Sequence, residues 1–160
     1  MEIRPALPEE LDLIMELYSR GRQFMRQSGN ENQWISGYPS RTLIEEDLRQ
    51  GRCFLALEEG ETAAVFCFFQ GEEPSYREID GAWISDGPYG VVHRIVSTGQ
   101  RSGIVQTCTD WCLAQCHSLK IDTHRDNLPM RRALERCGFS YCGVIVIEDG
   151  TQRLAYQKIV

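Results

Sequence analysis

VVHRIVSTGQRSGIV, residues 91–105, is the most informative segment of this chain. Its first seven residues are mostly apolar and β-branched, which predicts a strand over Val91–Ser97. A polar turn that contains Gly99 and Gly103 follows, and a helix is expected from Ile104 onward. A helix N-terminus offers backbone N–H groups without intrahelical partners and about half a positive charge. The stretch therefore predicts an anion site, and phosphate is the expected anion.

The turn also carries side chains that suit phosphate. Arg101 supplies a mobile charge and Ser102 a hydroxyl, while the two glycines permit positive φ and close backbone approach. The turn has neither the G-x-x-x-x-G-K-[ST] nor the G-x-G-x-x-G spacing, so the two common nucleotide loops are not indicated. An ordinary strand-to-helix connection remains the alternative.

A second segment, KIDTHRDNLPMRRALERCGF over residues 120–139, predicts a strand, an Asn127 cap, a helix and a glycine stop. With the turn, it resembles the GCN5-related N-acetyltransferase (GNAT) superfamily. In that family a Q/R-x-x-G-x-G/A loop wraps the pyrophosphate of acetyl-CoA, and an Asn-started helix closes with Gly-Phe. The matching residues are Gln100, Gly103, Val105, Asn127, Gly138 and Phe139.

The resemblance implies an α/β (α+β) GNAT fold, formed by one domain over residues 1–160. We expect a mixed central sheet of about seven strands, with splayed parallel strands 4 and 5, and about four helices. The expected order is a strand at residues 3–6, two helices, a hairpin over residues 53–69, and then β-α-β-α-β-β. The final two strands are expected at residues 140–146 and 153–159, joined at Asp149-Gly150.

Composition narrows the partners and the compartment. The chain has 160 residues, 42% of them hydrophobic, with a net charge of −6 and no dense run of Lys and Arg. No nucleic-acid partner is therefore expected. No apolar run approaches the ~20 residues of a membrane span, so no membrane partner is expected either. Charges near the N-terminus leave no signal-peptide core, which predicts a cytoplasmic protein. The resemblance implies a small-molecule amine as the partner, and a homodimer remains open.

The seven cysteines include no C-x-x-C pair. Cys108, Cys112 and Cys116 repeat every four residues on a predicted helix, with His117 beside the last. One helix alone does not close a tetrahedral metal site, and cysteine is commonly buried, so core packing is favoured over a metal site. No metal is expected.

The resemblance implies where the cofactor lies. The strand over residues 91–97 and its parallel neighbour over residues 119–124 splay apart, and the pantetheine arm of acetyl-CoA enters between them along residues 94–97. The cofactor-binding residues expected on this basis are Ile95, Val96, Ser97, Gln100, Arg101, Ser102, Gly103, Ile104, Val105, Asn127, Met130 and Arg131.

Acetyl transfer to an amine needs a base, and His93 is the first candidate because imidazole titrates near neutral pH. Strict alternation would place Tyr89, Val91, His93 and Ile95 on one face of the strand. A histidine hydrogen-bonded within the sheet is the structural alternative. Tyr89 is the second catalytic candidate, and the third is His124, which is also expected to contact the substrate.

The identity of the general acid is left open, because Leu134 stands where the family often has a tyrosine. Water, Cys137, or the hydroxyl of Ser97 or Tyr89 could protonate the leaving thiolate. Otherwise the chain is a non-catalytic acyl-CoA-binding or regulatory domain. An α/β module without a coenzyme A site is a third alternative.

The resemblance implies that two aromatic segments line the acceptor side. Trp34 and Tyr38 lie in the loop between the first two helices, and Trp83 precedes the cofactor strand, although Trp83 could instead be buried in a strand over residues 79–85. Three acidic residues close to these segments suit a small cationic amine; they are Glu31, Asp80 and Asp86. Protein N-termini, amino acids, polyamines and aminoglycosides all remain open as acceptors.

Overall fold

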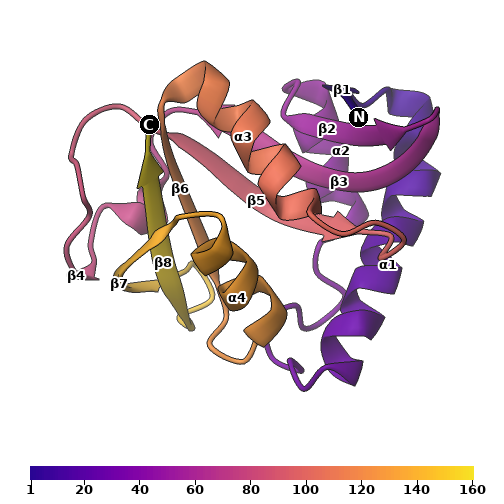
Figure 1. The fold of residues 1–160 in the computed structure, drawn as a ribbon. Coiled ribbons are helices and arrows are strands. Elements are labelled where there is room, and N and C mark those ends of the chain that lie inside the picture. Colours follow the sequence, from indigo (N-terminus) through magenta and orange to yellow (C-terminus); the bar gives the residue numbers. More distant parts are fainter.

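A mixed sheet of eight strands, in the order β1-β2-β3-β5-β6-β8-β7-β4, forms the centre of the structure, a computed structural model that describes residues 1–160 (Figure 1). The strands are β1 (Glu2–Pro5), β2 (Cys53–Glu58), β3 (Glu61–Gln70), β4 (Asp80–Gly81), β5 (Gly90–Ser97), β6 (Ser118–Thr123), β7 (Ser140–Val146) and β8 (Gln152–Ile159). The helices are α1 (Leu11–Gln27), α2 (Arg41–Arg49), α3 (Ile104–Cys116) and α4 (Leu128–Arg136), with short 3₁₀ turns η1 (Pro8–Glu10) and η2 (Pro74–Tyr76).

This architecture confirms the expected fold and order of elements. The sheet has eight strands rather than about seven because β4 adds a two-residue strand at its edge. The strand expected over residues 79–85 is therefore wrong in length, since only Asp80 and Gly81 pair with β7. The expected parallel strands 4 and 5 are β5 and β6. No helix combines the length and apolar character that a membrane crossing requires.

The helix starts follow from their capping residues. The hydroxyl of Ser40 accepts a hydrogen bond from the backbone N–H of Leu43 at 3.1 Å, which begins α2. The Asn127 side chain accepts from the N–H of Met130 at 3.2 Å and begins α4. Gly103 precedes α3 with φ 75°, a left-handed conformation that glycine adopts without strain. The three N-termini are thus encoded locally.

Helices cover both faces of the sheet. In Figure 1, α3 and α4 lie over one face and α1 and α2 over the other. A core cluster of 17 buried residues, including Cys108 and Cys112, packs beneath α3 and α4. A second cluster of nine residues packs beneath α1 and α2. Burial raises the pKa of the Cys108 thiol to about 12, as expected for a cysteine that packs in a core.

The parallel strands β5 and β6 pair only at one end. Gly90, Val91 and Val92 pair with residues 119–121, and beyond this point the strands part toward α1 and α4 (Figure 1). From His93 onward, the edge of β5 that faces β6 therefore has no strand partner. The expected splay of the two strands is present.

A β-bulge at Arg94 changes which way the following side chains point. Cys67 pairs with His93 and Val65 with Val96, so Arg94 and Ile95 together face a single residue of β3. Arg94 has φ 54°, and its carbonyl accepts from the buried Tyr18 hydroxyl of α1 at 2.9 Å. The bulge is thereby held against α1.

The bulge corrects the alternation expected for this strand. Ile95 belongs to the cluster beneath α3 and α4, whereas Val96 belongs to the cluster beneath α1 and α2. The side chain of Arg94 contacts Asp47 of α2. His93 and Ile95 therefore do not share a face, because the extra residue shifts the alternation by one position after His93.

Candidate active site

A cavity of about 320 Å³ lies where β5 and β6 part. It is lined by α1, the end of β5, the start of α3 and the start of α4. Seven of the expected cofactor residues line it: Ile95, Val96, Ser97, Ile104, Val105, Asn127 and Met130. Residues that the sequence did not indicate include Leu17, Arg20, Gly21 and Phe24 of α1. The mostly apolar lining suits an alkyl chain carrying few polar groups.

The turn at the end of this cavity presents a row of free donors. The backbone N–H groups of residues 101–106 donate to no acceptor in the protein. Gly99 and Gly103 have φ of 80° and 75°, and a Cβ at either position would meet no atom within 4 Å. The exposed side chains of Gln100, Arg101 and Ser102 flank these donors. Free N–H groups at a helix start with open space before them offer the kind of donors that an anion such as phosphate accepts from.

Two expected cofactor residues have partners within the protein. The guanidinium of Arg101 forms an ion pair with the Glu58 carboxylate at the end of β2. Arg131 donates from Nη1 to the carbonyl of Arg125 at 2.9 Å, and its buried Nε has no acceptor. Neither residue lines the cavity.

His93 lies where the two strands begin to part, between two carboxylates. Its Nε2 is 3.2 Å from Oε2 of Glu73, and its Nδ1 is 3.9 Å from Oδ2 of Asp122. The hydrogen bond with His93 lowers the pKa of Glu73 below its ordinary value. Asp122 also accepts from the Tyr76 hydroxyl at 2.6 Å. The acidic groups beside the candidate base are thus Glu73 and Asp122, which the sequence analysis did not single out.

Tyr89 and Trp83 support the segment that carries Glu73 and Tyr76 through hydrogen bonds to its backbone. The hydroxyl of Tyr89 accepts from the backbone N–H of Glu73 at 2.9 Å, and the indole N–H of Trp83 donates to the Tyr76 carbonyl at 2.9 Å. Nζ of the buried Lys120 lies 3.8 Å from the ring centre of Tyr89 and 4.1 Å from that of Trp83. Burial lowers the pKa of Lys120. Tyr89 and Trp83 therefore hold the segment that carries Glu73 and Tyr76.

The aromatic residues of the loop between α1 and α2 come together over β5. The Trp34 ring lies 5.7 Å from that of Tyr18 and 6.0 Å from that of Tyr38, both edge-on. The Tyr38 hydroxyl accepts from Nη1 of Arg94 at 3.0 Å, and Nη2 of Arg94 lies 2.7 Å from Oδ2 of Asp47. Desolvation raises the pKa of Tyr38, which keeps its hydroxyl protonated at neutral pH.

The same loop is attached to α4 and to β8. Oε1 of Gln33 accepts from Nδ2 of Asn127 at 2.9 Å and from Nδ2 of Asn30 at 2.8 Å. The Gln33 carbonyl accepts from Nη2 of Arg153 at 2.9 Å. Asn127 therefore caps α4 with its oxygen and holds the loop with its nitrogen.

His124 lies just beyond the end of β6. Its Nδ1 accepts from the backbone N–H of Asp126 at 3.0 Å. Burial, and then the positive charge of Arg153, lower the pKa of His124. A neutral imidazole therefore stands at this end of the site.

Leu134 and Cys137 of the α4 segment are both buried and present no exposed proton donor to the site. Leu134 is fully buried in the cluster beneath α3 and α4. Cys137 belongs to the same cluster, and burial raises the pKa of its thiol.

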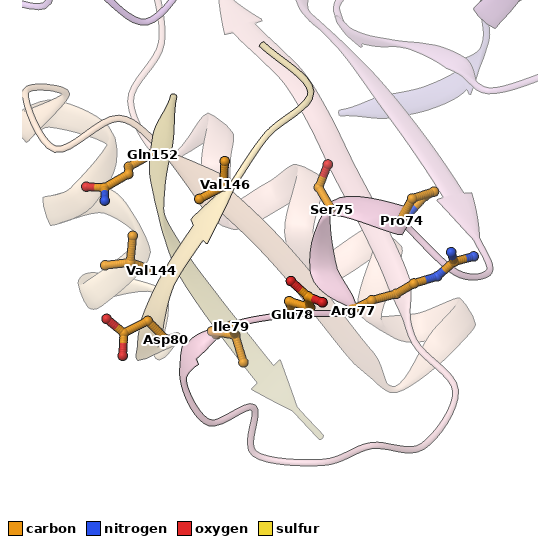
Figure 2. A pocket seen from close by; sticks show the side chains of 9 residues that line it. All are labelled: Pro74, Ser75, Arg77, Glu78, Ile79, Asp80, Val144, Val146 and Gln152. Atoms are coloured by element: carbon orange, nitrogen blue, oxygen red, sulfur yellow. The ribbon is translucent and has the colours of Figure 1, made fainter. Parts of the chain in front are cut away.

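A second cavity, of about 510 Å³, lies apart from this site between η2, β4 and β7 (Figure 2). Its lining comprises Pro74, Ser75, Arg77, Glu78, Ile79, Asp80, Val144, Val146 and Gln152. It shares no residue with the first cavity, and Asp80 is the single lining residue among those expected near the acceptor.

Solved structures share this fold. An acetyltransferase of the GNAT family from Streptococcus agalactiae is 33% identical, with a TM-score of 0.90 over 99% of this chain and 95% of that one. A ribosomal-protein-alanine N-acetyltransferase from Brucella melitensis is 17% identical, with a TM-score of 0.63 over 100% of both chains. An aminoglycoside acetyltransferase in complex with coenzyme A and kanamycin is 16% identical, with a TM-score of 0.67 over 98% of this chain and 93% of that one. No family model and no curated protein matches the sequence.

Proposed function

Because the chain belongs to the GNAT family of acetyltransferases, we propose that it transfers an acetyl group from acetyl-CoA to a small amine by direct attack on the thioester. The observation that carries this proposal is the continuity of the site. A row of free backbone N–H groups at residues 101–106 adjoins an apolar cavity, and that cavity lies at the gap between β5 and β6 where His93 stands. Phosphate, alkyl arm and reacting group would each meet suitable chemistry.

The residues present fit acetyl-CoA. Residues 101–106 would hold its phosphates through backbone N–H groups, and Arg101 would add charge. Ile95 and Met130 would pack along the pantetheine arm, whose amides would pair with the free edge of β5. When bound, acetyl-CoA supplies an acetyl thioester, whose acyl carbon an amine can attack.

Side chains of the protein then accept the proton that the amine loses. His93 accepts a proton from the incoming ammonium, and the carboxylates of Glu73 and Asp122 stabilise the imidazolium that forms. A free backbone N–H of β5 beyond Val92 stabilises the developing oxyanion. Tyr89 acts here as a positioning residue, because its hydroxyl holds the backbone of Glu73.

A second candidate function is supported by one observation. Residue 134 is a buried leucine, so α4 carries no hydroxyl at the position where related enzymes often have a tyrosine. A domain that binds acyl-CoA and regulates another process without efficient catalysis would not need that proton donor.

Calorimetry with acetyl-CoA, followed by an amine screen monitored for free thiol, tests both candidates. The proposed enzyme binds acetyl-CoA and releases thiol only when an amine is present. Binding without thiol release across the screen would favour the non-catalytic domain. Absence of binding at millimolar acetyl-CoA would remove both candidates.

A further inference from the structure

Arg153 of β8 is a buried cation without a carboxylate partner. Its residue is only 4% exposed. Nη1 donates to the Thr151 hydroxyl at 3.0 Å and to the Gln152 carbonyl at 2.8 Å, and Nη2 donates to the Gln33 carbonyl at 2.9 Å. All three acceptors are neutral. A guanidinium has five N–H donors, so Nε–H and one N–H of Nη2 have no acceptor in the protein.

A buried charge in this state is unfavourable. Buried charged groups are normally paired, because desolvation of an ion is costly unless an opposite charge or hydrogen bonds offset it. Burial lowers the pKa of Arg153, in agreement with this cost. The other arginine beside the site, Arg94, is already paired with Asp47. Arg153 therefore keeps two N–H donors that are free to bind an anion.

The neighbouring strand carries the opposite charge, and the two charged groups form no ion pair. Asp122 of β6 pairs with Ala155 of β8, and Arg153 lies two residues from Ala155 on the same face. Diagonal neighbours of this kind have Cα atoms about 7–8 Å apart. Asp122 also stands beside His93, where the amine would react. The site thus presents an ammonium-binding group and an anion-binding group on adjacent strands.

This arrangement suits a ligand that carries both charges. We propose that the acceptor is a free amino acid or a closely related amino carboxylate, with its carboxylate held by Arg153 and its amine directed to His93 and Asp122. The planar fork of a guanidinium matches a carboxylate in two hydrogen bonds, and two N–H donors of Arg153 are available. Polyamines and aminoglycosides lack the carboxylate, and a peptide N-terminus carries an amide in its place. The proposal rests on the proposed acetyltransferase function.

The experiment compares matched acceptors with the unmodified protein. Each L-amino acid is assayed with acetyl-CoA beside its carboxamide, and kcat/KM is measured from free thiol. A charge-assisted pair contributes about 1.5–3 kcal/mol, so the acid should exceed its carboxamide by about 10–100-fold for the preferred side chain. In Arg153→Met this ratio should fall to about one, and Arg153→Lys should restore part of it.

A binding measurement makes the test independent of turnover. Calorimetry with coenzyme A present should show the N-acetyl amino acid binding more tightly than its carboxamide, by a similar factor. This arm uses the unmodified protein, so it also stands if Arg153→Met does not fold after losing its contact with Gln33.

The outcomes separate the two proposals. If the protein acetylates carboxamides and acids equally well, the acceptor proposal is overturned and the acetyltransferase function stands. If no amine is acetylated but the N-acetyl acids bind in preference to the carboxamides, the acetyltransferase function fails and the carboxylate site stands. If there is neither acetylation nor binding preference, both fail. An arginine that only holds the loop predicts equal values for acid and carboxamide in every assay.

Discussion

Nε2 of His93 and Oε2 of Glu73 lie 3.2 Å apart, although one residue belongs to β5 and the other to the segment before η2. His93→Gln should lower kcat by about 10²–10⁴-fold, because the variant cannot accept the amine proton. Acetyl-CoA should still bind, as measured by calorimetry, and the acidic limb of the kcat/KM profile should disappear. Full activity with an unchanged pH profile would assign the role to Tyr89, His124 or water.

The same contact predicts how the protein responds to acid. The hydrogen bond with His93 lowers the pKa of Glu73 from its ordinary value of 4.5. This contribution to stability is present above the ordinary value and is lost as the pH falls through the lowered one. Below pH 4.5 the free energy of unfolding should therefore fall more steeply in the unmodified protein than in Glu73→Gln. Urea titrations across the acid range check this, with the exposed Glu31→Gln as the matched control.

The free N–H groups before α3 predict a sharp effect of charge at Gly103. Acetyl-CoA should raise the Tm of the unmodified protein by binding its native state, and Gly103→Glu should abolish that shift because a carboxylate would meet phosphate. Gly150→Glu is the matched control for backbone strain. Gly150 has φ 84°, close to the 75° of Gly103, and its surroundings are equally open. That control lies in the turn between β7 and β8 and should keep the shift. Equal loss in both variants would point to strain rather than to a phosphate site.

The ion pair between Arg101 and Glu58 predicts a gain in affinity. Glu58→Gln releases the guanidinium for phosphate, and exposed ion pairs contribute about 0.2–1 kcal/mol, so acetyl-CoA should bind about 1.5–5-fold more tightly. Acetylpantetheine has no phosphate, and its affinity should not change. Calorimetry with both donors tests this. A similar gain for acetylpantetheine would mean that Glu58 acts on the arm of the cofactor instead.

The edge-on contact between Trp34 and Tyr38 predicts an effect on the acceptor. Trp34→Ala should raise the KM of the amine about tenfold while the Kd of acetyl-CoA stays within about twofold. It should also cost about 1–3 kcal/mol of stability, because the half-buried ring packs on Tyr18. Trp34→Phe keeps an aromatic contact, so its KM for the amine and its stability should lie between those of the unmodified protein and those of Trp34→Ala. Equal weakening of both ligands would identify Trp34 as part of the cofactor site.

Much of the fold could be predicted because its signals are local. The apolar run of β5, the Ser40 and Asn127 caps and the glycine before α3 each act within a few residues. The bulge at Arg94 could not be predicted in this way. An arginine carries no local signal for φ 54°, and the bulge depends on the pairing of β5 with β3 and on a hydroxyl from α1.

The site was less predictable because it joins distant segments. Asp122 and Arg153 are charged residues within the strands expected at residues 119–124 and 153–159, and that much is visible in the sequence. Their position on one face follows only from the register of β6 and β8. Glu73 lies in a loop and gives no such signal. Its contact with His93 spans 20 residues and depends on η2 folding over the sheet.

Gln33 contacts both halves of the proposed site, through Asn127 at the start of α4 and through Arg153 of β8. A ligand that displaces either contact changes the free energy of the conformation that the other ligand requires. Linkage makes that effect reciprocal, so the factor by which the coenzyme alters acceptor affinity equals the factor by which the acceptor alters coenzyme affinity. One glutamine would thereby let a coenzyme and an acceptor, bound as proposed, change each other's affinity without touching.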